Sequence, residues 1–326
     1  MSKSPNPYGT PELTGLPQNA IKCLVKHLDY LEQFRLLRTC RHLNENLPIK
    51  IPVIIIIFSG KNVQVYLQKE LKIPPEYTKI EYDTCHDVYG TYIGCKIWES
   101  RNFQRQGRGN PGFYAARFLR RLFSRKFLEI SGICVDFSAS ENHSENKISE
   151  FFEILKSRIS EFPVKTLCVS EIKNLIFNFF EIFQISEFSS NNEKSGIEDL
   201  EILAKLNSWK FLEVLNFEKL AIVPKYESNF AHLKSITLTV VLLNVPDLIE
   251  IKEAFMTSKI LQLYLVYCNG LSSAMLIEAF GFGIENSGMT ITWAFPIIDT
   301  PQILFIEYFI KSEFQKKSHV DFRRIG

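Results

Sequence analysis

Apolar positions along this chain follow two different periods, and the change falls near residue 50. Between Leu16 and Leu47 the spacing is helical, with one apolar stripe at Ile21, Leu24, Val25 and Leu28 and a second at Leu36, Cys40, Leu43 and Leu47. About thirty residues cannot bury that much apolar surface alone, since isolated domains below about 40 residues usually need a metal, a disulfide or a partner. The pattern predicts a small helical docking element. The alternative is an ordinary helical hairpin packed on its own domain.

After this segment the pattern changes to β-structure. Val53–Phe58 is a β-branched run that predicts a buried strand, and alternating segments follow around Val65, Ile80 and Cys95. Residues 51–100 therefore predict a small β linker region. A Gly- and Arg-rich loop is expected over 102–112, followed by a helix over 113–127.

The remainder predicts strands that alternate with helices. Three segments share the form L-x-x-L-x-L, and their starts lie 21 and 27 residues apart: Leu212/Leu215/Phe217, Leu233/Ile236/Leu238 and Ile260/Leu263/Leu265. A fourth candidate, Val164/Leu167/Val169, begins 48 residues before Leu212, with no identifiable unit between them. These intervals are typical of leucine-rich repeats, although the array is degenerate. Helices are expected over 171–183, 247–256 and 272–280, and strands over 289–298, 302–310 and 319–325 that cap the open edge of the array.

The polar residues inside these strands predict which side of the array faces a partner. As polar positions of the expected strands, they are assigned to the concave face of the array. They are Glu213, Asn216, Lys234, Thr237, Gln262 and Tyr264.

Charge is distributed unevenly. The formal net charge is +2, but residues 101–126 hold eight basic side chains and no acidic one. The candidate anion patch within this stretch consists of Arg108, Arg117, Arg120, Arg121 and Arg125. Arginine clusters bind phosphates and carboxylates, so the patch predicts a solvated helix face, an acidic or phosphorylated protein partner, or nucleic acid.

Seven scattered cysteines without a CxxC pair favour a reducing compartment, and no apolar run approaches the 18–20 residues of a membrane span. Cytoplasmic or nuclear localisation is expected. The proline-containing residues 1–12 read as a flexible lead-in. No histidine has a second metal ligand at a suitable spacing, so no metal is expected.

The sequence Gly107-x-Gly109-x-x-Gly112 resembles a dinucleotide-binding turn. Such a turn follows an apolar strand directly, whereas polar residues precede Gly107 and Pro111 lacks one of the N–H donors. No cofactor is therefore expected, and a nucleotide-dependent enzyme remains only as a third hypothesis. No ordered set of nucleophile, base and acid appears, so no catalytic residues and no enzymatic activity are predicted.

The N-terminal motifs carry a resemblance to a known family. Leu16-Pro17, Leu24, Leu28-Asp29, Cys40-Arg41 and Leu43 match, without gaps, the order of residues in the F-box, a three-helix motif that docks onto a Skp-type adaptor. Looser matches follow at Lys79–Tyr82, Trp293–Pro296, Gln302–Tyr308 and Asp321–Ile325. Together they are similar to nematode-expanded F-box A proteins with an F-box-associated FTH-type domain.

This resemblance implies an α/β protein with a three-helix F-box over 13–50, the β linker region over 51–100, and a repeat-like substrate-binding (FTH-type) domain over 101–326. The implied function is substrate recognition in an SCF-type ubiquitin ligase, with a Skp-type adaptor and cullin complex and an unknown target protein as partners. The expected adaptor-binding residues are Leu16, Pro17, Ile21, Leu24, Val25, Leu28, Leu36, Cys40 and Leu43. The alternative is a repeat-type binding module that uses the anion patch independently of any ligase.

Overall fold

A computed structural model describes residues 17–28, 32–33, 36, 49–59, 62–68, 77–87, 90–97, 102–107, 110–125, 128–137, 145–157, 159, 161–170, 177–190, 202–220, 230, 232–240, 243–257, 260–267, 271–286, 290–309 and 318–326. Leu16, Cys40, Leu43 and Arg108, as well as the lead-in 1–12, lie outside this set.

The described helices are α1 (Gln18–Lys26), α4 (Pro111–Phe123), α5 (Glu145–Lys156), α6 (Phe177–Ile182), the short 3₁₀ helix η3 (Asn207–Phe211), α8 (Val245–Thr257) and α9 (Ser273–Phe280). The strands are β1 (Ile49–Phe58), β2 (Asn62–Gln68), β3 (Tyr77–Asp87), β4 (Gly90–Ile97), β5 (Asn102–Gly107), β6 (Leu128–Asp136), β7 (Phe162–Val169), β8 (Phe183–Ser190), β9 (Val214–Leu220), β10 (Ser235–Val240), β11 (Gln262–Tyr267), β12 (Ile284–Asn286), β13 (Thr290–Pro296), β14 (Ile303–Phe309) and β15 (Ser318–Ile325). The expected α/β class is confirmed.

All of these strands belong to one sheet of 15 strands, in the order β12-β13-β14-β15-β11-β10-β9-β8-β7-β6-β1-β2-β3-β4-β5. Strands β1 and β6 to β11 form a parallel centre, which we call the array. Antiparallel strands flank it on both sides, β2 to β5 at one end and β12 to β15 at the other. The expected β linker region is thus continuous with the array, because β1 pairs with β6.

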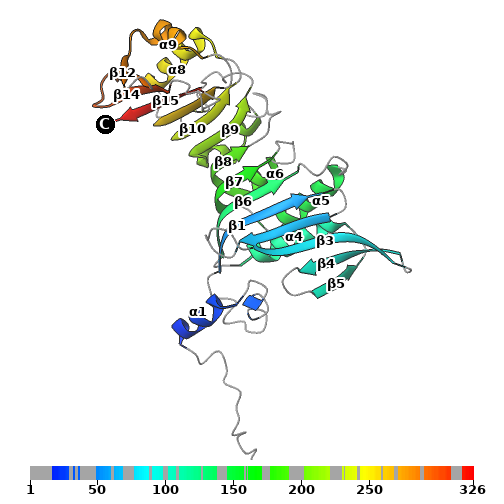
Figure 1. Cartoon of the computed structure of the whole chain (residues 1–326). Helices are drawn as coiled ribbons and strands as arrows, with labels where there is room; N and C mark the ends of the chain where they lie inside the picture. The colour runs from blue at the N-terminus through cyan, green and yellow to red at the C-terminus, as the bar shows by residue number, and fades with distance from the viewer. Residues whose placement is uncertain are drawn as a thin grey trace, which may run out of the picture.

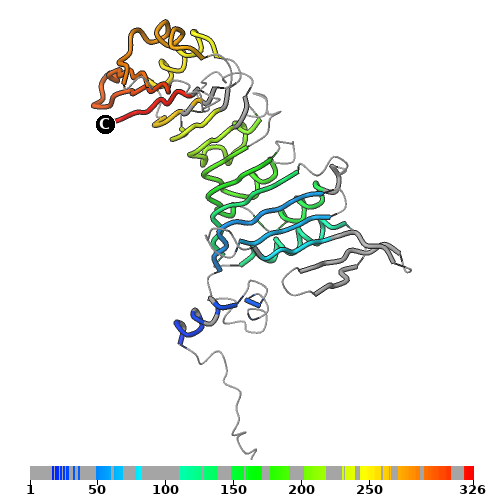
Figure 2. The backbone as a smooth tube through the Cα atoms, in the orientation of Figure 1, coloured from blue at the N-terminus to red at the C-terminus, as the bar shows by residue number. Residues whose placement is uncertain are grey.

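The helices α4 to α9 follow one side of the curved sheet, and none of these described helices covers the other side (Figure 1). Figure 2 shows the last strand at the opposite end of the molecule from α1. We call the side of the sheet opposite to α4–α9 the open face.

The inner side of the array is built from apolar rows that run across the strands. Leu215, Ile236 and Leu263 lie in register on β9, β10 and β11, and each is at most 1% exposed. Phe217, Leu238 and Leu265 form the next row in the same way. The three predicted triplets therefore occupy equivalent places on adjacent parallel strands.

The unit that the sequence left unidentified is β8. Val164 and Leu167 of β7 pair with Ile185 and Phe188 of β8, and Phe188 pairs in turn with Leu215 of β9. The third position of this unit is Ser190 instead of an apolar residue, although it is fully buried. The missing apolar residue conceals the repeat in the sequence.

A chain of phenylalanine rings holds the helices against the array. Phe58 of β1 meets Phe151 of α5 edge-on with a centroid distance of 5.1 Å, and Phe152 meets Phe179 of α6 in the same way at 4.7 Å. Phe179 stacks on Phe183 of β8 at 5.9 Å. Such pairs contribute about 0.5–1.5 kcal/mol each beyond the area they bury. They explain how a Phe-rich chain closes this interface.

One local prediction is wrong, and two predicted helices differ from their expected bounds. The expected loop over 102–112 contains β5, whose residues continue the antiparallel ladder from β4. In the described residues, the helix predicted over 171–183 corresponds to α6, which ends at Ile182 because β8 begins at Phe183. The helix expected over 113–127 is α4, which begins at Pro111 and ends at Phe123. The three-helix arrangement expected over 13–50 is not shown by the described residues, where α1 is the only complete helix.

Candidate functional site

Helix α1 carries the described part of the predicted adaptor-binding set. It begins directly after Pro17, which is exposed and whose carbonyl accepts hydrogen bonds from the amides of Ala20 and Ile21 at 2.9 and 3.1 Å. The end of the helix is held by Gln33, whose Nε2 donates to the carbonyl oxygens of Val25 and Leu28 at 3.0 and 2.9 Å. Local polar contacts therefore fix both ends of a nine-residue helix.

The described members of the expected adaptor-binding set differ in their exposure. Ile21 and Val25 are only 5% and 7% exposed, so the chain itself covers them. Leu28 is half-buried, and Leu36 packs against the apolar core. Leu24 lies in α1, but its side chain is outside the description. Of the described members, Pro17 and Leu28 are left to contact a partner.

The open face of the array carries part of the polar set expected from the sequence. Asn216, Thr237 and Gln262 are half-buried and alternate with the buried residues of the inner rows, so they face the open side. Glu213 and Lys234 are exposed, but they precede β9 and β10 and lie two residues before the buried Leu215 and Ile236, so the alternation does not place them on this face. Tyr264 occupies the matching position beside Thr237, although its side chain is not described.

Exposed charged side chains near the beginnings of the array strands form oppositely charged pairs. Lys50 Nζ is 2.6 Å from Glu129 Oε2, Lys165 Nζ is 3.2 Å from Glu187 Oε1, and Lys234 Nζ is 2.8 Å from Glu213 Oε1. The first two pairs join neighbouring strands, and the third joins the residues that immediately precede β10 and β9. Exposed pairs of this kind contribute at most about 1 kcal/mol each, so their main effect is to leave this part of the array electrically balanced.

A second polar cluster lies on β2 and β3. Glu81 Oε1 accepts hydrogen bonds from the side-chain amides of Asn62 and Gln64, each at 2.9 Å, and Lys79 Nζ lies 3.6 Å from Glu81 Oε2. The hydroxyl of Tyr66 donates to Gln64 Oε1 at 2.8 Å. These contacts fix the side chains of five residues and leave the face flat and polar there.

Two cysteines are paired across β6 and β7 on the same face. Cys134 and Cys168 are direct neighbours in the parallel ladder, and both are half-buried free thiols. The hydrogen bond with Cys168, together with burial, raises the pKa of the Cys134 thiol. A raised pKa keeps the thiol protonated, so Cys134 is a weak nucleophile.

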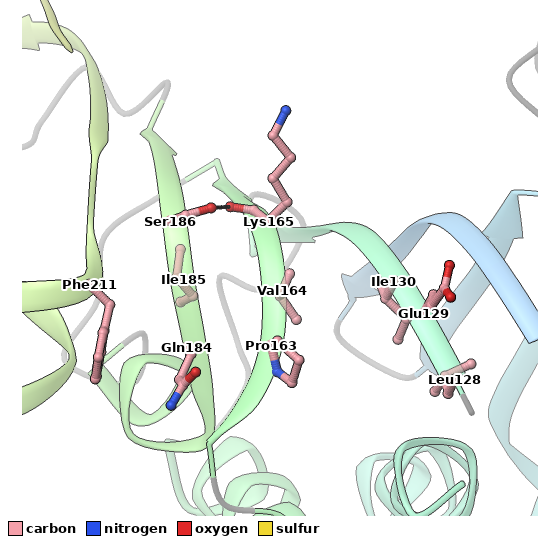
Figure 3. A pocket seen from close by; sticks show the side chains of 10 residues that line it. All are labelled: Leu128, Glu129, Ile130, Pro163, Val164, Lys165, Gln184, Ile185, Ser186 and Phe211. Carbon is pink, nitrogen blue, oxygen red and sulfur yellow. Dashed lines mark hydrogen bonds between the residues drawn. The ribbon is translucent and has the colours of Figure 1, made fainter. Parts of the chain in front are cut away.

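A shallow pocket of about 470 Å³ opens where β6, β7 and β8 begin (Figure 3). Figure 3 labels its apolar lining on all three strands and on η3: Leu128, Ile130, Val164, Ile185 and Phe211. Ser186 Oγ donates to the carbonyl of Lys165 at 2.9 Å at its rim. Phe211 is 42% exposed and has Lys210 Nζ 5.0 Å from its ring centroid. The pocket has room for an apolar side chain, and nothing in the sequence pattern indicated it.

The described arginines of the anion patch lie on or just after α4. Arg117 is half-buried, with its guanidinium 5.4 Å from the ring centroid of Phe113. Arg120 donates to Ser157 Oγ at 3.5 Å, and Arg121 is exposed. Burial lowers the pKa of Arg125. Arg120 and Arg121 lie in the last turn of α4, and cations near a helix C-terminus stabilise the helix, so these two residues also contribute to folding.

The glycine triplet does not form a dinucleotide-binding turn in the described residues. Gly107 ends β5, which pairs antiparallel with β4, whereas the dinucleotide turn connects parallel strands. Asn110 caps α4, and its Oδ1 accepts a hydrogen bond from the amide of Gly112 at 2.9 Å. The amide that a phosphate would need is already bonded.

The C-terminal strands place a charged cluster on the open face. Asp321 of β15 pairs with Glu307 of β14, and Arg323 lies between them, with its Nε 3.0 Å from Asp321 Oδ2 and a terminal nitrogen bonded to Glu307. Burial raises the pKa of Asp321. Burial also lowers the pKa of His319, against the opposing effect of Asp321 and Glu307.

No known protein family's sequence profile matches this chain, and no curated protein matches it either. No helix in the described part of the chain has the length and apolar character needed to cross a membrane. In the same residues, no three His, Cys, Asp or Glu side chains lie together as metal ligands would. The candidate sites are the open face of the sheet and α1, which begins directly after the exposed Pro17.

Proposed function

We propose that this chain is a non-enzymatic substrate adaptor of an SCF-type ubiquitin ligase. In this proposal residues 13–50 form an F-box that binds a Skp-type adaptor, and the sheet domain binds a target protein. Ubiquitin transfer is then carried out by other subunits, and this chain contributes by holding the target close to them. Such a complex acts in the cytosol or the nucleus.

The observation that carries the proposal is the ungapped series of F-box residues from Leu16-Pro17 to Leu43. Two structural features support it. Pro17 is exposed at the start of α1, which is where the motif presents its Leu-Pro to the partner. The sheet offers a wide open face, opposite to α4–α9, which suits recognition of a second protein. We further propose that the array is a degenerate leucine-rich-repeat-like domain of FTH type, closed by the C-terminal strands.

The proposal is tested by co-expressing the full-length chain with a Skp-type adaptor and measuring the recovered complex. Replacing Leu16, Pro17 and Leu24 together by Ala should lower recovery about tenfold or more, because the motif's contact residues would be lost. Ile21 and Val25 are left unchanged, since both are buried and their loss would unfold α1.

The matched control changes two exposed residues of the same segment, Cys23→Ala and His27→Ala. It should bind as the wild type does. Equal recovery of the triple variant and the wild type, with both proteins folded by circular dichroism, would contradict the adaptor role.

A second candidate function rests on the arginines of α4. A binding module for nucleic acid or an acidic partner would use Arg117, Arg120 and Arg121, which come from one helix without an acidic residue. Its affinity for a labelled oligonucleotide should fall steeply with salt and be lost in Arg120→Glu/Arg121→Glu. The charge-matched control is Lys205→Glu/Lys210→Glu, which changes two exposed lysines away from α4.

A further inference from the structure

The turn between α9 and β12 holds one phenylalanine in solvent. Phe282 is 94% exposed, the highest value among the exposed large hydrophobic side chains of the described residues. It lies between two glycines. Gly281 ends α9 with a φ of 82°, a left-handed conformation that favours glycine, and its amide donates to the carbonyl of Ile277 at 2.8 Å.

Both sides of this turn are fixed by Trp293 of β13. Trp293 Nε1 donates to the carbonyl of Gly281 at 2.9 Å. Gly283 packs so closely that an added Cβ would lie 2.6 Å from Trp293 Cε2 and 2.6 Å from Ile291 Cγ2. The backbone on either side of Phe282 is therefore held firmly, although its side chain contributes little to burial. A fixed and exposed aromatic side chain is typical of a binding anchor.

Ile284 adds a second exposed apolar side chain close to this anchor. It is the first residue of β12 and lies two residues after Phe282. Ile284 is 71% exposed, and every residue of β12 is exposed. β12 is also the outermost strand in the order of the sheet at this end. An outermost strand offers backbone N–H and C=O groups to an added strand.

The charge around this edge favours a basic partner. Residues 271–309 contain four acidic side chains and no Lys, Arg or His. Glu307 is bonded by Arg323, while Glu278, Glu285 and Asp299 are exposed. Further exposed apolar side chains surround the strand ends here, with Ile298 80% exposed. Lys252 of α8 also reaches this end of the sheet, with its Nζ 3.9 Å from the ring centroid of Phe295, so the acidic and apolar character belongs to the exposed residues of the 271–309 segment itself.

We propose that β12 and the Phe282 turn dock an extended peptide in which apolar residues alternate with Lys or Arg. The peptide adds a strand to the edge of the sheet, its apolar side chains contact Phe282 and Ile284, and its cations face Glu285. A second copy of this chain fits less well. Two β12 strands paired antiparallel about their centres would place Glu285 opposite Glu285, and like charges in that position are destabilising. Nucleic acid is repelled by the same acids.

The test uses the full-length chain and labelled nine-residue peptides, with binding measured by fluorescence anisotropy. A peptide of alternating Lys and Val should bind, and its counterpart with Glu in place of Lys should not. The variant Phe282→Ser/Ile284→Thr should bind the Lys peptide about tenfold more weakly or worse. Its matched control, Ile202→Thr/Ile249→Thr, changes two exposed isoleucines elsewhere and should bind as the wild type does.

Two N-methylated versions of the Lys peptide test for strand addition. Alternate residues of an added strand direct their N–H groups toward the edge, so methylation of one set should abolish binding and methylation of the other should not. Equal binding of the Lys and Glu peptides, or equal binding by the variant and the wild type, overturns the proposal. The proposal is also overturned if the wild type sediments as a dimer and the Phe282→Ser/Ile284→Thr variant sediments as a monomer. None of these outcomes depends on the ligase role, which is tested at α1.

Discussion

The array and the C-terminal strands β12 to β15 belong to one sheet, but their exposed surfaces differ. On the array, lysines and glutamates lie in opposite pairs such as Lys165–Glu187 and Lys234–Glu213. On the C-terminal strands, Phe282 and Ile284 face solvent beside acidic side chains. Phe211, which lies beside the array, is 42% exposed, whereas Phe282 and Ile284 are 94% and 71% exposed and add little to the stability of the fold. The two parts of the sheet therefore differ in how much apolar surface they leave in contact with water.

The largest expected effect comes from removing an inner residue of the array. Phe188 is 1% exposed, and its ring lies 5.2 Å from that of Phe180 and 6.0 Å from that of Phe217. Phe188→Ala should lower the free energy of unfolding by about 3–5 kcal/mol, because it leaves a cavity between two strands and a helix. Denaturant titration measures this loss. If Phe188→Ala lowers the free energy of unfolding no more than Phe282→Ala, a substitution of an exposed residue, then the inner rows of the array do not determine the stability of the protein.

A smaller loss is expected from Gly283→Ala. The new methyl would overlap Trp293, Ile291 and the carbonyl of Thr292, which lies 2.9 Å from the added Cβ. The expected cost is about 1–3 kcal/mol, and the exposed Phe282 should move with the turn. The same titration gives the cost, and the Lys peptide should bind more weakly. Unchanged stability and unchanged binding would show that the turn is not held as described.

Trp293→Phe isolates the polar contribution to the same turn. The substitution keeps an aromatic ring against Phe280, whose centroid lies 5.6 Å away, but removes the donor to the Gly281 carbonyl. The expected cost is about 1 kcal/mol. A thermal melt beside that of Gly283→Ala tests the order of the two effects. A larger loss than for Gly283→Ala would mean that ring size, and not the hydrogen bond, holds the turn.

The smallest expected effect is pH-dependent and lies in β15. Because burial lowers the pKa of His319 below its usual 6.5, the unfolded chain binds the proton more readily. Stability should therefore decrease as pH falls below about 6.5. His319→Phe keeps the stack on Phe309, whose centroid lies 4.1 Å away, and should reduce this decrease. Unfolding midpoints of both proteins between pH 7.5 and 5.5 test this prediction. At lower pH Asp321, whose pKa is raised, binds its proton more readily in the folded state, which increases stability as pH falls and would oppose the effect of His319. Identical pH dependence in both proteins would contradict the assignment to His319.

Much of the sheet could be predicted because its inner rows repeat in the sequence. The triplets at Leu212, Leu233 and Ile260 identified three parallel strands and, among the polar residues, Asn216, Thr237 and Gln262 of the open face. The unit in β8 was missed for two physical reasons. Its third position is Ser190, and the apolar run before Phe183 reads equally well as helix, since a run buried on all sides has no period. β5 was missed because asparagine and glycine, which begin and end it, are uncommon in strands.

The binding surfaces were less predictable. Sequence pattern indicates that Phe282 is apolar but not that it is exposed, because exposure depends on how α9 and β13 meet. The pocket between β6 and Phe211 likewise depends on strand ends that are far apart in the chain. For the predicted F-box residues, helical spacing placed Ile21 and Val25 on one stripe, but it could not indicate that the chain covers that stripe itself.

The parallel pairing of β1 with β6 has a consequence for synthesis. Ile54 lies beside Ile133, so the ribosome must deliver four further strands and α4 before β1 finds this neighbour. Until then one side of the aliphatic run Val53–Phe58 has nothing to pair with, and such runs associate readily with other chains. We therefore expect nascent chains that stop before β6 to aggregate, and the protein to depend on chaperones early in its translation.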